Sequence, residues 1–207
     1  MNKKKIIHCG YVFYETPFEI LERDISEKFL DTYSKKKEKT LGELIRTKGA
    51  CKAEAKKTVL ELKEYSRFLD KEVTVFMRYL YNKGDRFYLE LLNKHGCEKF
   101  CTFRLTDEQI YRQRGLYLYT LDGEIMYVGR CLDNFASRFN SNYGSILSIN
   151  CYKGGRSTNT HINSLVNRYG DNIKIYLCIL SDEKKIIEAE KLLLEDKDQR
   201  PDWNRRK

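Results

Sequence analysis

Period-two alternation of side chains is clearest after residue 110. Residues 115–121 and 125–131 form two alternating runs with the turn dipeptide Asp122-Gly123 between them, which predicts an antiparallel hairpin. A third alternating run, at 173–179, predicts another strand. Apolar residues recur at helical spacing in segments that begin near residues 133, 159 and 183. The pattern predicts an α+β fold in which helices flank a small three-stranded antiparallel sheet.

The first 110 residues are expected to be mainly helical. Residues 18–33 carry apolar side chains at helical spacing, Thr40 and Glu43 form a capping box for a short helix, and residues 52–69 follow a longer helical period. Residues 73–79 alternate toward a glycine-containing turn, which predicts a β-hairpin. This order is similar to a winged helix-turn-helix, and an ordinary helical domain with a solvated lysine face is the alternative.

The change of pattern near residue 110 predicts two domains, at 1–110 and 111–207. A chain of 207 residues is long enough for one substantial core or for two small domains. We expect the second domain to hold the chemistry and the first to recognise a partner.

The chain has an excess of basic side chains. It contains 39 Lys and Arg against 30 Asp and Glu, a formal net charge of +9. Such a chain attracts polyanions, so nucleic acid is the first candidate partner, and a lysine-rich solvated surface is the alternative. Lys52 and Lys56 lie on the polar face of the helix expected at 52–69, where they are candidates for contacts with DNA phosphates.

The cysteines match neither a disulfide framework nor a metal site. They are seven in number and scattered, and no apolar signal segment precedes them, which favours reduced thiols inside a cell. Cys97 and Cys101 follow His95, but no second cysteine pair completes a zinc site. No run approaches the roughly 20 apolar residues that a membrane span needs. The chain is therefore expected to be soluble and cytoplasmic.

Several motifs, in this order, resemble the GIY-YIG nuclease family. The hairpin holds Gly115-Leu116-Tyr117 on its first strand and Tyr127-Val128-Gly129 on its second. Arg138 follows in a helix, a carboxylate lies on a late helix, and Pro201-Asp202-Trp203-Asn204 ends the pattern. Leucine and valine replace the two isoleucines of the family motif, and both changes conserve volume. The resemblance implies that residues from about 111 onward cleave phosphodiester bonds.

The resemblance assigns roles to individual residues. Tyr117 corresponds to the tyrosine that is thought to deprotonate the attacking water, and Tyr127 to the tyrosine that helps place water and phosphate. Arg138 corresponds to the helix arginine, whose planar guanidinium suits bidentate contact with phosphate, and Arg130 is a second candidate for DNA contact. Asn204 corresponds to the closing asparagine, which orders the site beside the DNA. Cross-strand packing and surface charge are the alternative roles for the tyrosines and for Arg130.

Glu190 is the expected metal ligand. Helical spacing places it on one stripe with Ile186 and Leu193, toward the sheet, and leaves Glu188 and Glu195 on the solvated face. A carboxylate that faces a core is costly unless it is paired or holds a cation. Mg²⁺ or Mn²⁺ is therefore expected at Glu190, and a buried ion pair is the alternative.

The segment from residue 153 to residue 170 adds a loop and a histidine. Lys153 and Arg156 flank two glycines, a combination that suits a bound phosphate. His161 is a candidate for proton transfer or DNA contact, with a solvated histidine as the alternative. The family often has a His or Tyr one helical turn after its arginine, but here that position is Asn142, with Tyr143 one further, so this role stays unassigned.

The register of the hairpin decides whether its two tyrosines share a site. A two-residue turn at Asp122-Gly123 places Tyr117 and Tyr127 on opposite faces. A three-residue loop or a bulge between Leu121 and Ile125 brings both to one face. A shared active site therefore predicts an odd-length loop or a bulge in that stretch. The pairs then expected are Tyr119 with Tyr127 and Tyr117 with Gly129.

Together these features predict a metal-dependent endonuclease that hydrolyses double-stranded DNA, of the restriction or phage type within the family. A homing or structure-selective nuclease is the alternative with the same chemistry. A DNA-binding protein with an inactive nuclease fold is the alternative from another class. Cutting both strands needs two active sites or two visits, so a homodimer is compatible with this function.

Overall fold

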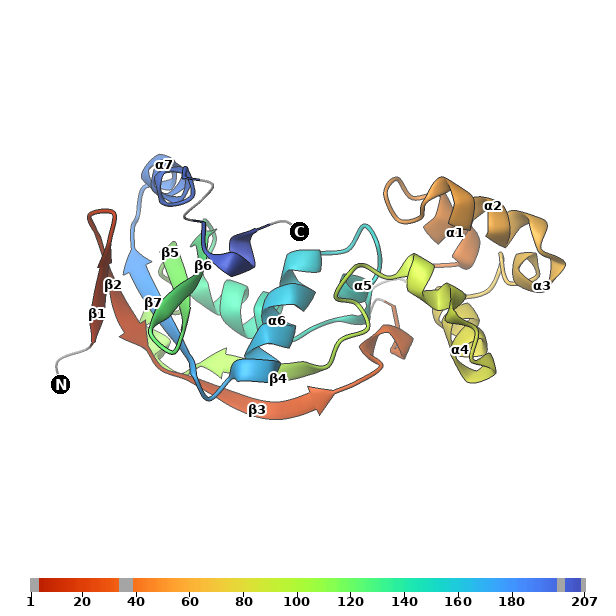
Figure 1. The fold of residues 1–207 in the computed structure, drawn as a ribbon, viewed down its shortest axis with the longest axis horizontal. Coiled ribbons are helices and arrows are strands. Elements are labelled where there is room, and N and C mark those ends of the chain that lie inside the picture. The colour runs from red at the N-terminus through yellow and green to blue at the C-terminus, as the bar shows by residue number, and fades with distance from the viewer. Residues whose placement is uncertain (1–3, 34–38, 197–199, 206–207) are drawn as a thin grey trace. The chain divides into compact units, whose positions relative to one another are not determined.

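The computed structural model describes residues 4–33, 39–196 and 200–205 (Figure 1). Within these ranges the main sheet has five strands in the order β1-β2-β7-β5-β6, and each neighbouring pair is antiparallel. Its strands are β1 (Lys5–His8), β2 (Tyr11–Thr16), β5 (Gly115–Leu121), β6 (Glu124–Cys131) and β7 (Ile173–Ile179). The strands β3 (Phe18–Ile25) and β4 (Phe100–Leu105) form a separate two-stranded sheet.

Helices connect and cover the strands. The α-helices are α1 (Leu41–Arg46), α2 (Ala53–Glu61), α3 (Lys63–Ser66), α4 (Val73–Lys83), α5 (Ser148–Cys151), α6 (Ser157–Tyr169) and α7 (Glu183–Leu193). The short 3-10 segments are η1 (Lys28–Leu30), η2 (Arg86–Leu91), η3 (Glu108–Ile110) and η5 (Asp202–Asn204), and η4 (Ala136–Tyr143) is a π-helix. Throughout the described ranges, each helix falls short of the length and apolar character needed to span a bilayer.

The chain divides into two compact units, and neither is continuous in sequence. Unit 1 combines residues 1–21, 102–144 and 168–207, and it contains the five-stranded sheet with η4 and α7. Unit 2 combines residues 22–101 and 145–167, and it contains α1 to α5 with most of α6. The domain border predicted near residue 110 falls inside unit 1, so the first 21 residues are grouped with the segment expected to be catalytic.

The predicted fold class is wrong in the extent of the sheet. The three expected strands lie side by side as β7, β5 and β6, but β1 and β2 extend the sheet beyond β7. The N-terminal part is therefore rich in strands rather than mainly helical. The helix predicted at 18–33 is replaced by β3 and the single turn η1. A short apolar run fits either period, and pairing of β3 with the distant strand β4 selects the extended form.

The β-hairpin predicted from residue 73 onward is also wrong, because this segment forms α4. Its buried residues Val73, Phe76, Met77 and Leu80 follow helical spacing. Gly84 ends the helix in the left-handed conformation, at φ +73°. The wing of the predicted winged helix-turn-helix is therefore missing from this segment. The helix predicted at 52–69 is present as two shorter helices, α2 and α3.

Local capping signals were predicted correctly. The Thr40 hydroxyl accepts a hydrogen bond from the backbone N–H of Glu43 at 3.1 Å, and the Glu43 carboxylate accepts one from the N–H of Thr40 at 3.0 Å. The predicted capping box at the start of α1 is confirmed. The late helix is confirmed as α7, where the Asp182 side chain accepts from the N–H groups of Lys184 and Lys185.

The central strand β5 is buried on both faces. Leu116 and Leu118 belong to a hydrophobic cluster shared with β6 and α7, which lies beside the sheet in Figure 1. The other members contributed by these elements are Val128, Ile186, Ala189 and Leu193. Tyr117 contacts η4 instead, with its ring centroid 5.1 Å from that of Phe139. Alternation along β5 therefore separates an aliphatic layer under α7 from an aromatic layer under η4.

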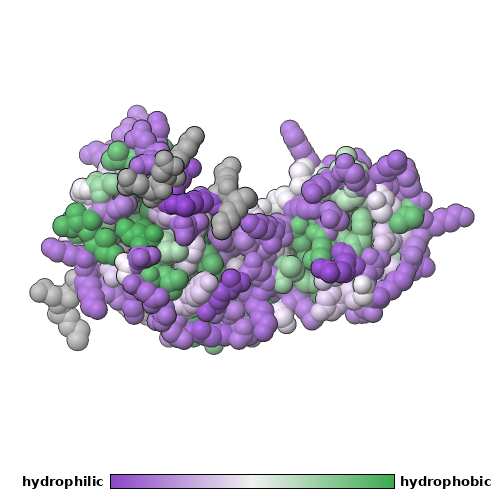
Figure 2. Space-filling view, in the orientation of Figure 1, coloured by the Kyte–Doolittle hydropathy of each residue, from purple (hydrophilic) through white to green (hydrophobic). Residues whose placement is uncertain are grey.

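The same sheet also carries exposed hydrophobic side chains. Ile7 on β1, Tyr14 on β2 and Ile179 on β7 are 65%, 49% and 54% exposed. Figure 2 shows hydrophobic surface on unit 1 around these strands. The most completely buried strand is β5, which carries Tyr117 of the candidate site.

Candidate active site

The β5–β6 hairpin brings the two motif tyrosines to one face. Its turn has two residues, Asp122 and Gly123, at φ +50° and +91°, and the register shifts by one residue between Tyr119 and Thr120. The predicted pairs are confirmed: Tyr119 lies opposite Tyr127, and Tyr117 lies opposite Gly129. The irregularity is a bulge at Met126, which follows Ile125, so the predicted three-residue loop is wrong and the bulge lies just past the predicted stretch.

Gly129 makes room for the Tyr117 ring. A Cβ atom at Gly129 would lie 2.4 Å from Cζ and 2.5 Å from Oη of Tyr117. Real Cβ contacts are longer than this, so any other residue at position 129 would displace the phenol. The second glycine of the hairpin motif therefore positions the first tyrosine.

Tyr143 is the centre of the polar cluster, and the sequence reasoning left it without a role. Its hydroxyl lies 2.7 Å from the hydroxyl of Tyr117, and Tyr127 also forms a side-chain hydrogen bond with it. The guanidinium carbon of Arg138 lies 5.5 Å from the centroid of the Tyr143 ring. Three phenols and one guanidinium thus meet inside unit 1.

The π-helical geometry of η4 explains why Tyr143 was missed. An α-helix aligns a residue with the fourth one after it, whereas a π-helix closes i to i+5. From Arg138 the fifth residue is Tyr143 and the fourth is Asn142. The only signal in the sequence was an aromatic residue one position beyond the expected turn. The helix start is held by the Asn134 side chain, which accepts a hydrogen bond from the Ser137 N–H at 2.7 Å, close to the start predicted near residue 133.

Both motif phenols are neutral in this environment. Burial raises the pKa of Tyr117 well above its usual value, Tyr143 and Tyr127 raise it further, and Arg138 opposes them. Burial likewise raises the pKa of Tyr127, with added contributions from Tyr143 and Glu190. Tyr117 is only 1% exposed. A tyrosine here can lose its hydroxyl proton, and then act as a base, only when more positive charge is brought close to it.

Arg138 retains a hydrogen-bond donor for an anion. Its Nε is buried and has no hydrogen-bond partner among the residues that the structure describes. The side chain also interacts with the thiol of Cys131 and with Tyr117. A buried donor without an acceptor is unfavourable, and a phosphate oxygen would satisfy it.

Glu190 lies in an ion pair with Arg130. The Oε2 atom of Glu190 is 2.5 Å from Nη1 of Arg130, and the two side chains are 20% and 41% exposed. Burial raises the pKa of Glu190, while Arg130 and Arg138 lower it. Glu188 and Glu195 are exposed, as the helical phase predicted. The structure therefore contains an ion pair at Glu190, which was the alternative to a metal site.

The metal expected at Glu190 fits this single carboxylate. In the described part of the chain, no group of three or more His, Cys, Asp or Glu side chains is arranged to hold a metal ion. Mg²⁺ often takes only one or two protein carboxylates and completes its shell with water and substrate phosphate. Glu190 can supply that one carboxylate once Arg130 moves aside. Arg138, which acts on Glu190 electrostatically, can donate a hydrogen bond to the substrate phosphate.

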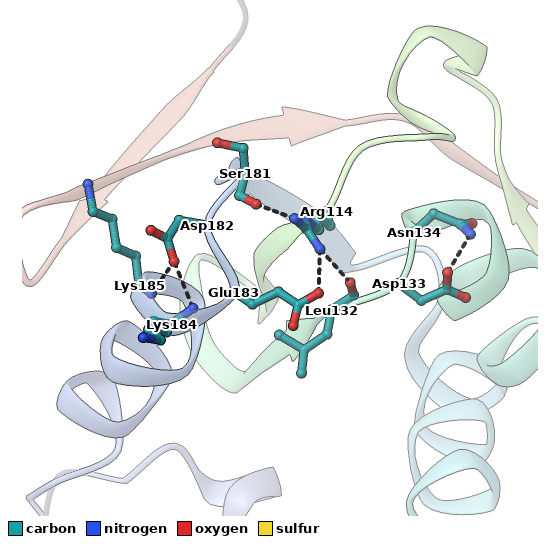
Figure 3. Close-up of polar contacts among 9 residues, drawn as sticks. All are labelled: Arg114, Leu132, Asp133, Asn134, Ser181, Asp182, Glu183, Lys184 and Lys185. Atoms are coloured by element: carbon teal, nitrogen blue, oxygen red, sulfur yellow. Dashed lines mark hydrogen bonds and ion pairs between the residues drawn. The ribbon is translucent and has the colours of Figure 1, made fainter.

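Arg114 fixes the start of α7 against the hairpin (Figure 3). Its Nη1 donates to the Glu183 carboxylate at 2.7 Å and to the Leu132 carbonyl at 3.4 Å, and its Nη2 donates to the carbonyl of Ser181. These contacts join the residues before β5, after β6 and after β7. They set the position from which α7 directs Glu190 toward β6.

Asn204 closes the outer edge of β6. Its Oδ1 accepts a hydrogen bond from the Val128 N–H at 2.7 Å, and its Nδ2 donates to the Val128 carbonyl at 2.8 Å. The amide thus imitates a neighbouring strand at an unpaired edge. This contact is consistent with the ordering role that the resemblance implies for Asn204. Both amide atoms of Asn204, Oδ1 and Nδ2, are engaged by Val128, and a contact with DNA would need the same atoms.

The other predicted site residues belong to unit 2. They are Lys52, Lys56, Lys153, Arg156 and His161. The ring of His161 on α6 lies 4.3 Å, between centroids, from that of His95, whose Nδ1 is 2.9 Å from a Glu98 carboxylate oxygen. The site assembled in unit 1 therefore consists of Tyr117, Tyr127, Tyr143, Arg138, Arg130, Glu190 and Asn204.

In the loop at residues 153–156, several groups that could bind a phosphate already contact other residues of the protein. The Lys153 ammonium lies 3.4 Å from the Glu90 carboxylate. The N–H of Lys153 donates to the Leu91 carbonyl, and the N–H of Gly155 donates to the Tyr152 carbonyl. Arg156, Lys52 and Lys56 have exposed side chains. In unit 2 these three cations are the better candidates for contact with a polyanion.

Comparison of the chain with protein-family models, with curated proteins and with solved structures finds no match. The assignment of function therefore depends on the residues of the site.

Proposed function

We propose that this chain is a metal-dependent DNA endonuclease with GIY-YIG-type chemistry. The observation that carries the proposal is the cluster in unit 1. Tyr117 and Tyr127 share Tyr143 as a hydrogen-bond partner, and Arg138 acts on both phenols electrostatically. Glu190, from a helix distant in sequence, acts on Tyr127 in the same cluster. A tyrosine, an arginine and a carboxylate are the parts that phosphodiester hydrolysis needs.

The position of each residue in the cluster suggests its role in the reaction. Arg138 binds a phosphate oxygen through its unsatisfied Nε and stabilises the charge that develops on phosphorus. Tyr127, which is less buried than Tyr117, orients the attacking water. Tyr117 first releases its hydroxyl proton to solvent when the metal adds positive charge, and the resulting phenolate then takes up the proton of that water. Tyr143 holds the Tyr117 oxygen through their 2.7 Å contact. Tyr143 thus takes the auxiliary position that the family pattern left open in this sequence.

Glu190 would hold Mg²⁺ or Mn²⁺, which supplies positive charge to the phosphate and lowers the pKa of bound water. That charge also answers the main difficulty of the site, since both phenols are neutral in their buried setting. Arg138 already lowers the pKa of Tyr117, and a phosphate bound to Arg138 would offset part of that effect, so the added positive charge has to come from the metal.

The partner in this proposal is double-stranded DNA. The net charge of +9 attracts it, and exposed Lys52, Lys56 and Arg156 give unit 2 cations for its phosphates. A restriction-type or phage-type enzyme acting in the cytoplasm, with two copies cutting the two strands, is the form we favour. A homing or structure-selective nuclease would use the same residues.

One observation favours the rival from another class, a DNA-binding protein without activity. Tyr117 is buried, and Arg130 is paired with the Glu190 carboxylate, so neither group is accessible to a substrate in this arrangement. The nuclease proposal requires that DNA and metal open the site.

Cleavage of supercoiled plasmid separates the two proposals. The full chain should convert the plasmid to nicked and then linear forms in Mg²⁺ or Mn²⁺, and a chelator should stop the reaction. Sequencing of the ends then tells whether the cuts are site-specific. If the protein retards the DNA on a gel but cuts it with neither ion, the inactive rival is correct.

A further inference from the structure

The ion pair between Arg130 and Glu190 lies where the metal is expected. The 2.5 Å contact joins a guanidinium on the edge strand β6 to a carboxylate on α7. The pair is not needed to fasten α7 to the hairpin, because Arg114 and the aliphatic cluster already do so. Its guanidinium is 41% exposed and its carboxylate 20% exposed, so Arg130 can turn away to solvent more easily than Glu190 can.

Arg130 and a divalent ion compete for the same carboxylate. A cation bound to Glu190 would lie within a few ångströms of the Arg130 guanidinium, and like charges at that distance in a half-buried setting repel strongly. The other positive group that acts on Glu190 is Arg138, which is held among Tyr117, Tyr143 and Cys131. Of the two arginines, Arg130 is therefore the one that can leave.

We propose that Arg130 is an exchangeable counterion, which holds Glu190 in the metal-free protein and moves to a DNA phosphate when the metal binds. This inference rests on the proposed nuclease function and adds its regulation. The exchange couples the two ligands: metal frees a cation for DNA, and DNA removes a competitor of the metal. By linkage, each ligand tightens the binding of the other by the same factor. The protein then takes up metal preferentially where DNA is present.

Metal binding without DNA gives the first test. Mn²⁺ is titrated into the full chain at about pH 8, where carboxylates are ionised, and free Mn²⁺ is followed by electron paramagnetic resonance. Loss of a half-exposed ion pair predicts that Arg130→Gln binds Mn²⁺ about three- to fivefold more tightly than the wild type. Arg130→Lys keeps the charge but loses the planar guanidinium, so its affinity should fall between the two.

Arg104→Gln is the matched control. Arg104 also pairs with a glutamate in unit 1, at 2.6 Å from Glu19, and it lies outside the polar cluster. This variant makes the same change of charge and side chain, so its Mn²⁺ affinity should equal that of the wild type. Glu190→Gln should lose the Mn²⁺ site, which shows that the measured ion is bound there.

The second test measures the coupling of metal and DNA. Binding of a short fluorescent duplex is followed with and without Mn²⁺ in the Tyr117→Phe background, so that the DNA stays intact. Mn²⁺ should tighten DNA binding when Arg130 is present, and this factor should fall at least about threefold in Arg130→Gln. The slope of log affinity against log salt in Mn²⁺ should also become shallower by about one, the contribution of one phosphate contact.

The outcomes distinguish this inference from the function on which it rests. A protein that binds Mn²⁺ at Glu190 with equal or lower affinity in Arg130→Gln contradicts the exchange and leaves the nuclease proposal standing. Unchanged coupling in that variant contradicts it as well. A wild-type protein that binds neither Mn²⁺ nor DNA contradicts both.

Discussion

At the scale of single residues, Tyr143 has the most consequences for the site. Its hydroxyl is shared by Tyr117 and Tyr127, and its ring carries the Arg138 guanidinium on one side. Each neighbour is a residue that the motif itself specifies. Tyr143 is therefore central to the site, although the family motif gives it no role.

Replacement of Tyr143 by phenylalanine tests this role. The ring and its packing are retained, but Tyr117 loses its hydroxyl partner in a buried position, which should lower the free energy of unfolding by about 1–3 kcal/mol. Loss of a group that holds the proton acceptor should slow plasmid cleavage about ten- to hundredfold. Tyr111→Phe is the control, because it removes a hydroxyl that donates to the Leu105 carbonyl at 2.7 Å elsewhere in unit 1. Equal cleavage by the two variants would remove Tyr143 from the mechanism.

The buried cysteines predict a second residue-scale property, alkaline instability. Burial raises the pKa of Cys101 to about 12, and likewise the pKa of Cys151 to about 12. Below about pH 8.5 the thiols are protonated whether the chain is folded or not, and their stabilising contribution is fully present. Above that pH the unfolded thiols ionise and the folded ones do not, so stability falls until the pH reaches the folded pKa.

Each of the two thiols should lower the free energy of unfolding by about 1.4 kcal/mol per pH unit above about pH 9. Urea unfolding measured with a reductant at pH 8 and at more alkaline pH checks this. The Cys101→Ser/Cys151→Ser variant should lose less stability over that interval, because serine does not ionise there. A variant with the same pH dependence as the wild type would show that the thiols do not contribute.

At the scale of elements, the β5–β6 hairpin determines the site through its register. The bulge at Met126 lets a two-residue turn coexist with Tyr127 opposite Tyr119. These pairs were predicted correctly because a site shared by both tyrosines restricts the register to one choice. The place of the bulge could not be predicted, because Met126 has no side-chain property that marks it.

Two deletions in β6 separate register from mere shortening. Removal of Met126 takes out the bulged residue and leaves the pairs of Tyr119 and Tyr117 unchanged, so cleavage should fall by less than about tenfold. Removal of Val128 exchanges the faces of Gly129 and Arg130, and it should abolish cleavage. Circular dichroism spectra and plasmid nicking are measured on both. A folded protein without Met126 that is as inactive as the one without Val128 would contradict the register account.

Elements encoded by neighbouring residues were predicted well, and elements that depend on distant partners were not. The capping box at Thr40, the strands β5, β6 and β7, and the phase of Glu190 on α7 each follow from a short window of sequence. The strand β3 and the addition of β1 and β2 to the sheet depend on partners many residues away. In the site, Tyr143 required knowledge of a π-helix, and the Arg130 contact required the tertiary position of α7.

At the scale of the whole molecule, the first strands are part of the unit that holds the site. Strand β2 pairs with β7, and Phe13 is fully buried in the cluster that also contains Leu116 and Leu118. A fragment of residues 111–207 would expose β7 as an edge and lose this core residue. The predicted division of labour at residue 110 therefore cannot be tested by simple truncation.

The fragment 111–207 should not fold cooperatively. Thermal unfolding followed by circular dichroism should give a broad, featureless transition for the fragment and a cooperative one for the full chain. Phe13→Ala in the full chain is the matched measurement, and a cavity at this buried site should lower the free energy of unfolding by about 3–5 kcal/mol. A fragment that melts cooperatively would show that β1 and β2 are dispensable for this fold.

In the proposed function one carboxylate of α7, Glu190, makes this site a nuclease, and a pair of substitutions on that helix can separate it from its neighbour. Plasmid cleavage in Mg²⁺ is compared for the wild type, Glu190→Gln and Glu188→Gln, two isosteric changes on one helix. Glu190 is directed into the polar cluster, and Glu188 is exposed. We expect Glu190→Gln to lose at least about a thousandfold in cleavage rate while it binds DNA in a chelator as the wild type does, and Glu188→Gln to cleave normally. Near-normal cleavage by Glu190→Gln, or loss of cleavage in Glu188→Gln instead, would contradict this proposal.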